Sequence, residues 1–206
     1  MGRREIDAVV FDMGGVIVEL GPLEEMLGDP SISAESFWPR WLASPAVRSF
    51  EMGRCTVTEF ADALVAELGL TIAPADLIER FARWPQGLYP GAAVLVDELR
   101  AAGTVTAVMS NTNALHWERQ RDAPQIRAMF EPAFLSYELG LAKPDAAAFE
   151  HVIAALDTEP GRIVFVDDNQ VNVDAACAAG IDGVRALGPT EARAALAERG
   201  LVQATP

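Results

Sequence analysis

Short apolar runs alternate along the chain with stretches whose apolar residues recur at helical spacing. The runs lack a strict apolar–polar alternation, which is typical of parallel strands buried on both faces. Strands that alternate with helices in this way predict an α/β fold with a doubly wound parallel sheet. The predicted strands are Ile6–Phe11, Val105–Met109, Ala133–Ser136, Ile163–Val166 and Gly183–Ala186.

Helical periodicity predicts the elements between and after these strands. Three of the predicted helices are followed directly by a glycine, which commonly ends a helix in a left-handed conformation. Pro144 precedes the remaining one. The predicted helices are Ala92–Ala102, Ala146–Leu156, Val171–Ala179 and Glu191–Arg199.

The segment from about Glu19 to Gly87 interrupts the alternation, because it carries helix signals and no convincing strand. The residues Thr56-Val57-Thr58-Glu59 form a capping-box pattern, which predicts a helix over Phe60–Leu68. Pro74 precedes another predicted helix, Ala75–Trp84. The segment also holds three of the four tryptophans, which we expect to pack inside a small helical bundle: Trp38, Trp41 and Trp84.

These patterns divide the chain of 206 residues into two parts. Residues 1–18 and 88–206 are predicted to form an α/β core domain, and residues 19–87 an all-helical cap subdomain inserted after the first strand. An insertion at that point is positioned to cover whatever lies at the end of the first strand.

Charge and composition narrow the classes of partner. The formal net charge is −14, and such a surface repels nucleic-acid phosphates and anionic lipid. The sequence shows no signal-peptide pattern and no apolar stretch of membrane-spanning length. We therefore expect a soluble cytoplasmic protein that binds neither nucleic acid nor membrane. The sequence leaves the oligomeric state open.

Polar residues follow four of the predicted strands. Asp12 follows the first strand, Ser110 and Asn111 the second, Lys143 lies in the loop after the third, and Asp167-Asp168 follow the fourth. Ligands of open α/β sheets bind outside the carboxyl ends of the strands, so these side chains are candidate site residues.

Each candidate also has a purely structural explanation. An aspartate before two glycines suits a turn, Ser110 and Asn111 can cap the next helix, and a lysine before proline is usually solvated. One acid of the pair Asp167-Asp168 can be a helix cap. Together these explanations fail, because two adjacent carboxylates at a buried strand end repel each other unless a cation lies between them and Asp12.

The chemistry that fits this set is phosphoryl transfer through an aspartate. A carboxylate nucleophile needs a divalent cation when it meets an anionic phosphate. Magnesium prefers oxygen ligands, which Asp12, one acid of the pair and a backbone carbonyl supply. The remaining phosphate oxygens need donors, and the hydroxyl of Ser110, the backbone N–H of Asn111 and the ammonium of Lys143 are the candidates.

The sequence resembles the haloacid-dehalogenase-like (HAD) superfamily over nearly its whole length. Four motifs are present in order: a hydrophobic strand into Asp12-x-Gly-Gly-Val, then Ser110-Asn111, then Lys143-Pro144-Asp145, and finally Asp167-Asp168. The stretch Ser110-Asn111-Thr112-Asn113-x-Leu115-His116, with Asn169 and Asn172, looks closest to a branch that contains glucose-1-phosphate phosphatases.

The resemblance implies a role for each motif residue. Asp12 is the implied nucleophile and magnesium ligand, the backbone carbonyl of Gly14 a second ligand, and Asp168 the second metal carboxylate with Asp167 in support. Lys143 is the implied catalytic and phosphate-binding lysine. Phosphatases of the superfamily usually carry a second aspartate two residues after the nucleophile, as general acid and base, but Gly14 occupies that position here.

The glycine at position 14 has a structural and a chemical consequence. Gly14-Gly15 predicts a turn with positive φ. A missing proton shuttle would cost about 10²–10⁴-fold in rate, unless water, the substrate or a cap residue compensates. If the missing carboxylate limits the chemistry, substrates with acidic leaving groups should react faster than alkyl phosphates.

Three functions of different classes remain. The first is a magnesium-dependent phosphatase of a small phosphorylated metabolite, for which a sugar phosphate is one candidate. The second is a dehalogenase, whose halide needs no proton donor but also no magnesium, although the acid pair is intact. The third is a phosphate-binding or regulatory protein without turnover, favoured by Gly14. A receiver domain is excluded, because its acid pair comes first in the chain and it has no cap.

Overall fold

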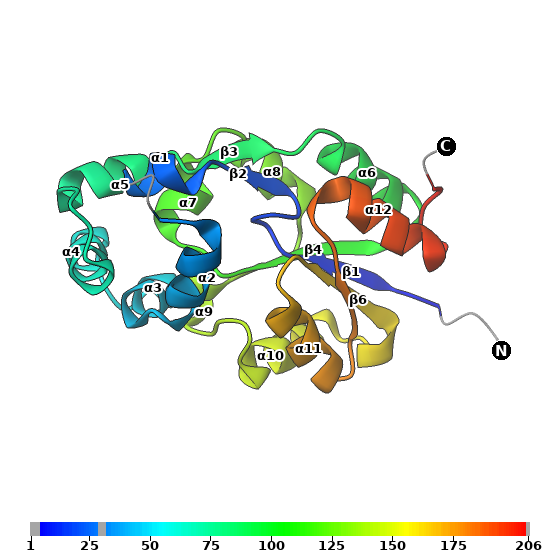
Figure 1. The fold of residues 1–206 in the computed structure, drawn as a ribbon. Helices are drawn as coiled ribbons and strands as arrows, with labels where there is room; N and C mark the ends of the chain where they lie inside the picture. Colours follow the sequence, from blue (N-terminus) through cyan, green and yellow to red (C-terminus); the bar gives the residue numbers. More distant parts are fainter. Residues whose placement is uncertain (1–4, 29–31, 205–206) are drawn as a thin grey trace.

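A five-stranded parallel sheet forms the centre of the structure, in the order β5-β4-β1-β6-β7 (Figure 1). The computed structural model describes residues 5–28 and 32–204. The strands are β1 (Ala8–Phe11), β4 (Val105–Ser110), β5 (Ala133–Leu135), β6 (Ile163–Asp167) and β7 (Asp182–Arg185). All five predicted strands are thereby confirmed, with ends shifted by one or two residues.

The middle strands are buried on both faces, which explains their continuous apolar sequence. Val9 and Phe11 of β1 belong to one hydrophobic cluster, whereas Ala8 and Val10 belong to another on the opposite face. The first cluster includes residues of α6 (Ala92–Ala101), α8 (Ala123–Met129) and α12 (Gly188–Glu198). The second includes residues of α10 (Ala146–Leu156) and α11 (Gln170–Ala178). The sheet is therefore a layer between two layers of helices.

Within the described residues, five helices and two short strands lie between β1 and α6. Strands β2 (Val18–Leu20) and β3 (Pro85–Leu88) pair antiparallel and bring the two ends of this segment together. Between them lie α1 (Leu23–Leu27), α2 (Ala34–Ala43), α3 (Pro45–Glu51), α4 (Val57–Leu68) and α5 (Pro74–Ala82). We call α1 to α5 the helical insert. The expectation that 19–87 holds no strand is wrong at its two ends, where the chain passes between the insert and the sheet.

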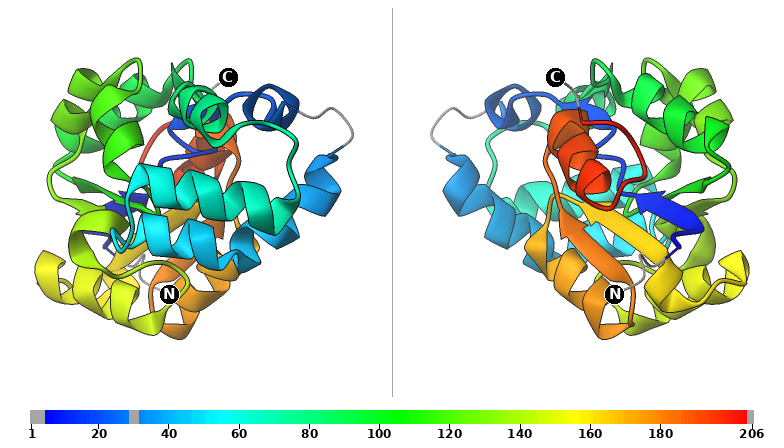
Figure 2. Two further views of the ribbon diagram at one scale, coloured as in Figure 1. Left: turned by 90° about the vertical axis from the view of Figure 1, so that its left-hand side faces the viewer. Right: turned by 90° about the vertical axis from the view of Figure 1, so that its right-hand side faces the viewer.

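The helical insert has a hydrophobic cluster of its own, which combines aromatic with aliphatic residues. Trp41 and Trp84 are buried there, and the capping box of Thr56 and Glu59 that opens α4 is formed as predicted. Trp38 is more exposed, although its ring stacks on Trp84 with centroids 5.9 Å apart. The left view of Figure 2 shows these helices in front of the sheet. The insert therefore packs around its own centre.

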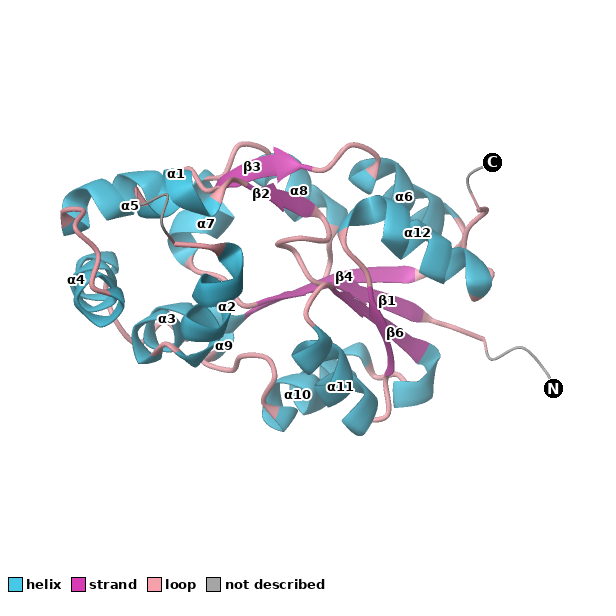
Figure 3. Cartoon of the chain, viewed as in Figure 1, coloured by secondary structure: helices cyan, strands magenta, loops and turns pink. Residues whose placement is uncertain are grey.

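Three further short elements complete the part of the chain that the structure describes. Helix α7 (Ala114–Arg119) follows β4, α9 (Ser136–Leu139) follows β5, and the 3₁₀ turn Pro160–Arg162 precedes β6 (Figure 3). From β1 the chain builds the sheet outward through β4 and β5, and then returns to the other side of β1 with β6. Such a reversal of strand order leaves a crevice at the strand ends, where α/β proteins bind ligands. No helix in the described ranges combines the length and apolarity needed to cross a membrane.

Candidate active site

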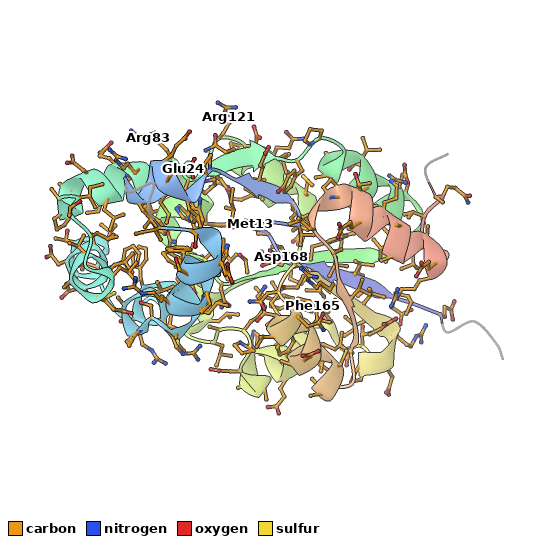
Figure 4. The ribbon with its side chains drawn as sticks, viewed as in Figure 1. Met13, Glu24, Arg83, Arg121, Phe165 and Asp168 are labelled. Atoms are coloured by element: carbon orange, nitrogen blue, oxygen red, sulfur yellow. The ribbon has the colours of Figure 1, made fainter. Side chains whose placement is uncertain are left out.

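The carboxyl ends of β1, β4 and β6 bring three of the predicted site residues to one edge of the sheet. Asp12 directly follows β1, and its backbone N–H donates to the Val166 carbonyl of β6 at 2.7 Å. Ser110 and Asp167 are the last residues of β4 and β6. Figure 4 shows Asp168 near this edge, toward the helical insert. The parallel register of neighbouring strands therefore brings residues that are far apart in sequence to one place.

Lys143 lies between two of these carboxylates. Its Nζ donates to Oδ1 of Asp12 at 2.6 Å and to Oδ2 of Asp167 at 2.7 Å, and the side chain is almost fully buried. Its backbone is fixed as well, because the Asn111 side chain donates to the Lys143 carbonyl and accepts from the Lys143 N–H, both at 2.9 Å. Lys143 is the only lysine in the sequence. Asn111 thus positions the lysine through its side chain.

For both Asp12 and Lys143, burial and the neighbouring opposite charge shift the pKa in opposite directions. Burial raises the pKa of Asp12 to about 7; Lys143 lowers that pKa, while Asp167 and Asp168 raise it further. Burial alone would lower the pKa of Lys143, but Asp12 and Asp167 outweigh it and raise that pKa above its usual value. The lysine therefore stays charged, and one ammonium faces three carboxyl groups.

Asp167 is saturated by hydrogen bonds. Its oxygens accept from Lys143, from the backbone N–H of Asn169 at 2.8 Å, and from Nδ2 of Asn172 at 3.0 and 3.1 Å. Asn172 was not assigned a role from the sequence. The sequence feature that could have indicated this role is its position five residues after Asp167, in the first turn of α11. From there its side-chain amide reaches the end of β6.

Asp168 lies against the turn that follows β1. A Cβ at Gly15 would lie 2.7 Å from Oδ2 of Asp168, so the carboxylate packs against the glycine backbone. Gly15 has φ +81°, whereas Gly14 does not have a positive φ, so the expected positive φ applies to only one of the two glycines. The Gly14 carbonyl accepts no hydrogen bond from residues 5–28 or 32–204. That oxygen is therefore available as a ligand.

Three carboxyl groups converge closely enough to hold a cation. One oxygen each from Asp12, Asp167 and Asp168 lies within 4.8 Å of the others. Three carboxylates with one ammonium leave an excess of negative charge in a buried place, which an oxygen-preferring divalent cation would offset. The donor set therefore fits magnesium, and Asp12, Asp168 and the carbonyl of Gly14 are the oxygens left free by the saturation of Asp167.

The loop after β4 is held in place beside Asp12. Ser110 is buried, and in the same loop the Thr112 N–H donates to Oγ of Ser136 at 2.9 Å, which in turn donates to the Thr112 carbonyl at 3.1 Å. Asn113 caps α7 by accepting from the His116 N–H at 3.0 Å. The structure thus brings together all the residues that the sequence singled out at the strand ends.

A comparison with models of protein families identifies the family of this chain. The model of a hydrolase family, the haloacid dehalogenase-like hydrolases, matches residues 6–180. The chain belongs to this family. A sesquiterpene phosphatase, astK, from Aspergillus oryzae is 29% identical over 179 residues, which cover 86% of this chain and 88% of that protein. An (S)-2-haloacid dehalogenase 1 from a Pseudomonas species is 27% identical over 192 residues, 87% of this chain and 84% of that protein.

Solved structures support the fold. An HAD family enzyme from Bacteroides thetaiotaomicron, in complex with magnesium and inorganic phosphate, superposes with a TM-score of 0.69. It is 23% identical, and the match covers 87% of this chain and 93% of that one. The chain is thus an HAD-like hydrolase built on a five-stranded α/β core, as its motifs predicted.

Proposed function

We propose that this HAD-like hydrolase is a magnesium-dependent phosphatase of a small phosphorylated metabolite, acting through an aspartyl-phosphate on Asp12. The observation that carries the proposal is the position of Lys143, whose ammonium contacts both Asp12 and Asp167 in a site with three carboxyl groups. A cationic side chain beside an anionic nucleophile allows that nucleophile to approach a phosphate, because it offsets the repulsion between two anions.

Each residue has a definite part in the proposed reaction. A carboxylate oxygen of Asp12 attacks phosphorus while the bond to the leaving-group oxygen breaks, and water later hydrolyses the aspartyl-phosphate. Lys143 stabilises charge on the transferring phosphoryl group, and Ser110 with the Asn111 N–H binds its other oxygens. Asp167, saturated by Lys143, Asn169 and Asn172, orients the lysine.

Magnesium would be held by Asp12, Asp168 and the carbonyl of Gly14. When bound, the ion neutralises charge on the carboxylates and on the phosphate. The fit rests on the convergence of the three carboxyl groups and on the free Gly14 carbonyl. The presence of magnesium and phosphate in the Bacteroides enzyme is consistent with this proposal.

A dehalogenase is the alternative that the relatives raise, because one of them carries that name at 27% identity. Displacement of halide needs no metal, so a dehalogenase has no use for a third carboxyl group beside Asp12 and Asp167. Asp168 is that third group, and it is buried enough that its pKa rises to about 6, mainly by desolvation and also by Asp167. Burial of this extra carboxyl group costs free energy, so its presence favours a phosphatase, in which it would bind the metal.

We further propose that residues 19–87 act as a cap that selects the substrate. The helical insert has its own hydrophobic cluster, and the paired strands β2 and β3 connect it to the core. An insert that packs around its own hydrophobic cluster can change other side chains without disturbing the sheet that carries Asp12. Cap residues, rather than the core motifs, would therefore determine which metabolite is hydrolysed.

The test is a panel of phosphate esters, including sugar phosphates, assayed with magnesium and with a chelator. We expect hydrolysis only with magnesium, and a loss of about 10³-fold or more in Asp12→Asn. Asp174→Asn is the control, because Asp174 is an exposed acid on α11 whose carboxylate accepts from the Gln170 side chain on the same helix. Substantial activity in Asp12→Asn would disprove the covalent mechanism. Phosphate binding without turnover in the natural protein would favour a regulatory, non-catalytic role.

A further inference from the structure

Among the described residues, the core motifs leave no carboxyl group free to protonate a leaving group. Position 14 is a glycine, and the atom nearest to a Cβ placed there would be Cδ1 of Leu20, at 3.4 Å. The charged core groups that act on Asp12 are Lys143, Asp167 and Asp168. Lys143 and Asp167 are bonded to each other, and Asp168 is needed for the metal. A proton donor must therefore come from outside the core motifs.

The end of helix α3 approaches the site from the helical insert. Helix α3 contacts α9 of the core, and the backbone of Gly53, just beyond α3, lies so close to the Tyr137 carbonyl that a Cβ would not fit. On α3, Arg48 forms an ion pair with Asp145, two residues after Lys143. Glu51 is three residues after Arg48, so both side chains lie on the same face of the helix. That face is directed toward the loop that carries the lysine.

Glu51 is the acid that this face presents to the nucleophile. The charged groups that act on its carboxyl are Lys143, Asp12 and Arg48. Glu51 therefore lies close enough to Lys143 and Asp12 to interact with both, and it approaches them from the end of α3 in the helical insert. It is partly buried, and within the described ranges its carboxyl has no hydrogen-bond partner. The group is thus free to bond to a substrate.

The direction of the reaction places the leaving group on that side. In phosphoryl transfer the attacking and leaving oxygens are roughly in line through phosphorus. Asp12 attacks from the end of β1, so the leaving oxygen points away from the sheet and toward the helical insert. Burial raises the pKa of Glu51 to about 8, with Asp12 adding to the rise and Lys143 and Arg48 opposing it. A carboxyl group in that state carries a proton at neutral pH.

We propose that Glu51 is the general acid and base of this hydrolase and replaces the carboxyl group that is missing at Gly14. The inference rests on the proposed phosphatase function. As the bond from Asp12 to phosphorus forms and the ester P–O bond breaks, Glu51 gives its proton to the leaving oxygen, and an alcohol departs. Glu51, now ionised, takes a proton from the water that attacks phosphorus, and the bond between Asp12 and phosphorus breaks. Phosphate is released and Glu51 is protonated again.

This role changes the expected substrate preference. Without a proton donor, the rate should fall steeply as the leaving group becomes less acidic, and only aryl, acyl or anomeric phosphates would react well. With Glu51 as donor, alkyl phosphates should react at rates comparable to those of aryl phosphates. General acid catalysis matters most for the poorest leaving groups, where it contributes about 10²–10⁴-fold.

The experiment compares kcat/KM for phosphate esters with leaving groups from nitrophenol to simple alcohols. We expect Glu51→Gln to lower the rate with alkyl esters about 10²–10⁴-fold and with nitrophenyl phosphate far less. Glu79→Gln is the control, since Glu79 is an exposed glutamate of α5 in the same insert. Retained nitrophenyl phosphatase activity shows that the Gln variant is folded.

A second variant separates a catalytic from a structural role. Gly14→Asp restores the carboxyl at the core position, where the backbone is unstrained and Leu20 leaves room. In the double variant with Glu51→Gln, it should recover part of the lost rate with alkyl esters. An equal loss with all esters, no loss, or no recovery in the double variant would each overturn the assignment of Glu51. If the natural protein hydrolyses no ester with magnesium, the proposed function itself fails.

Discussion

Adjacent acids at the end of β6 differ because of what surrounds each of them. Asp167 accepts hydrogen bonds from Lys143, Asn169 and Asn172, which satisfy both of its oxygens. Asp168 accepts no hydrogen bond from another described side chain; its own backbone N–H donates to the carboxyl, which packs against Gly15. A carboxylate with few partners keeps lone pairs for a metal, whereas a saturated one orients its neighbours. We therefore expect the same residue type to serve two roles one position apart, metal binding at Asp168 and positioning at Asp167.

Replacement of Asp168 by asparagine should separate metal binding from substrate binding. The variant loses a charged ligand, so we expect the magnesium concentration for half-maximal activity to rise by about 10-fold or more. KM for the phosphate ester at saturating magnesium should change much less. Asp174→Asn on α11 serves as the control. An unchanged magnesium titration for Asp168→Asn would show that this carboxylate is not a ligand.

The turn after β1 is the element that brings Asp12 and Asp168 together. Gly15 has a left-handed φ of +81°, its N–H donates to the Val18 carbonyl at 2.9 Å, and its carbonyl accepts from Gly188 at 2.7 Å. These bonds fix the turn between the strand end and the start of α12. A side chain at position 15 would meet both an unfavourable backbone conformation and the carboxylate of Asp168.

Gly15→Ala should therefore impair magnesium activation, unlike the same change at a glycine that has open space around it. Gly103 is the matched control, because it has a similar φ of +86° and nothing lies within 4 Å of an added Cβ. Both variants should lose about 1 kcal/mol or more in the free energy of unfolding from backbone strain. Only Gly15→Ala should also weaken magnesium activation, because its methyl group displaces Asp168. Urea unfolding and a magnesium titration measure the two effects, and equal magnesium activation in both variants would contradict the contact.

The sequence predicted the parts whose pattern is local. Buried parallel strands are apolar throughout, so β1, β4 and β6 and the polar residues at their ends could be found without a structure. Strands β2 and β3 were missed, because they are short and are paired only through the return of the chain. Glu51 has no local sequence signal either. In the sequence it is an ordinary glutamate at a helix end, and it comes near Asp12 only because α3 packs on the core. Tertiary contacts between distant segments account for what the sequence left out.

At the scale of the whole molecule, His116 makes a polar contact between the core and the helical insert. This buried histidine of α7 lies in the core, and its Nε2 is 2.7 Å from the carbonyl of Phe81 in α5 of the helical insert. Nε2 therefore carries the proton and donates, while Nδ1 accepts from Nδ2 of Asn113 at 3.4 Å. A neutral ring satisfies both contacts. A doubly protonated ring would place two donors against each other at Asn113.

A fall in pH should consequently destabilise the contact that His116 makes between the helical insert and the core. Burial lowers the pKa of His116 to about 4, against which the bond to Phe81 acts only in part, while an unfolded histidine has a pKa of about 6.5. The unfolded state then binds the proton more readily, so stability from this group is complete above pH 6.5 and is lost as the pH falls toward 4. The loss amounts to about 2–3 kcal/mol at pH 4.5.

The prediction is tested by urea unfolding of the natural protein and of His116→Gln at pH 7 and pH 4.5. Glutamine keeps an N–H donor for the Phe81 carbonyl but cannot take up a proton. Acid protonates carboxylates in both proteins alike, so the difference between their pH dependences isolates the histidine. We expect the natural protein to lose about 2–3 kcal/mol more than the variant between the two pH values. If both lose the same amount, the folded protein accommodates a charged His116, and the contact between α7 and α5 does not depend on its neutral ring.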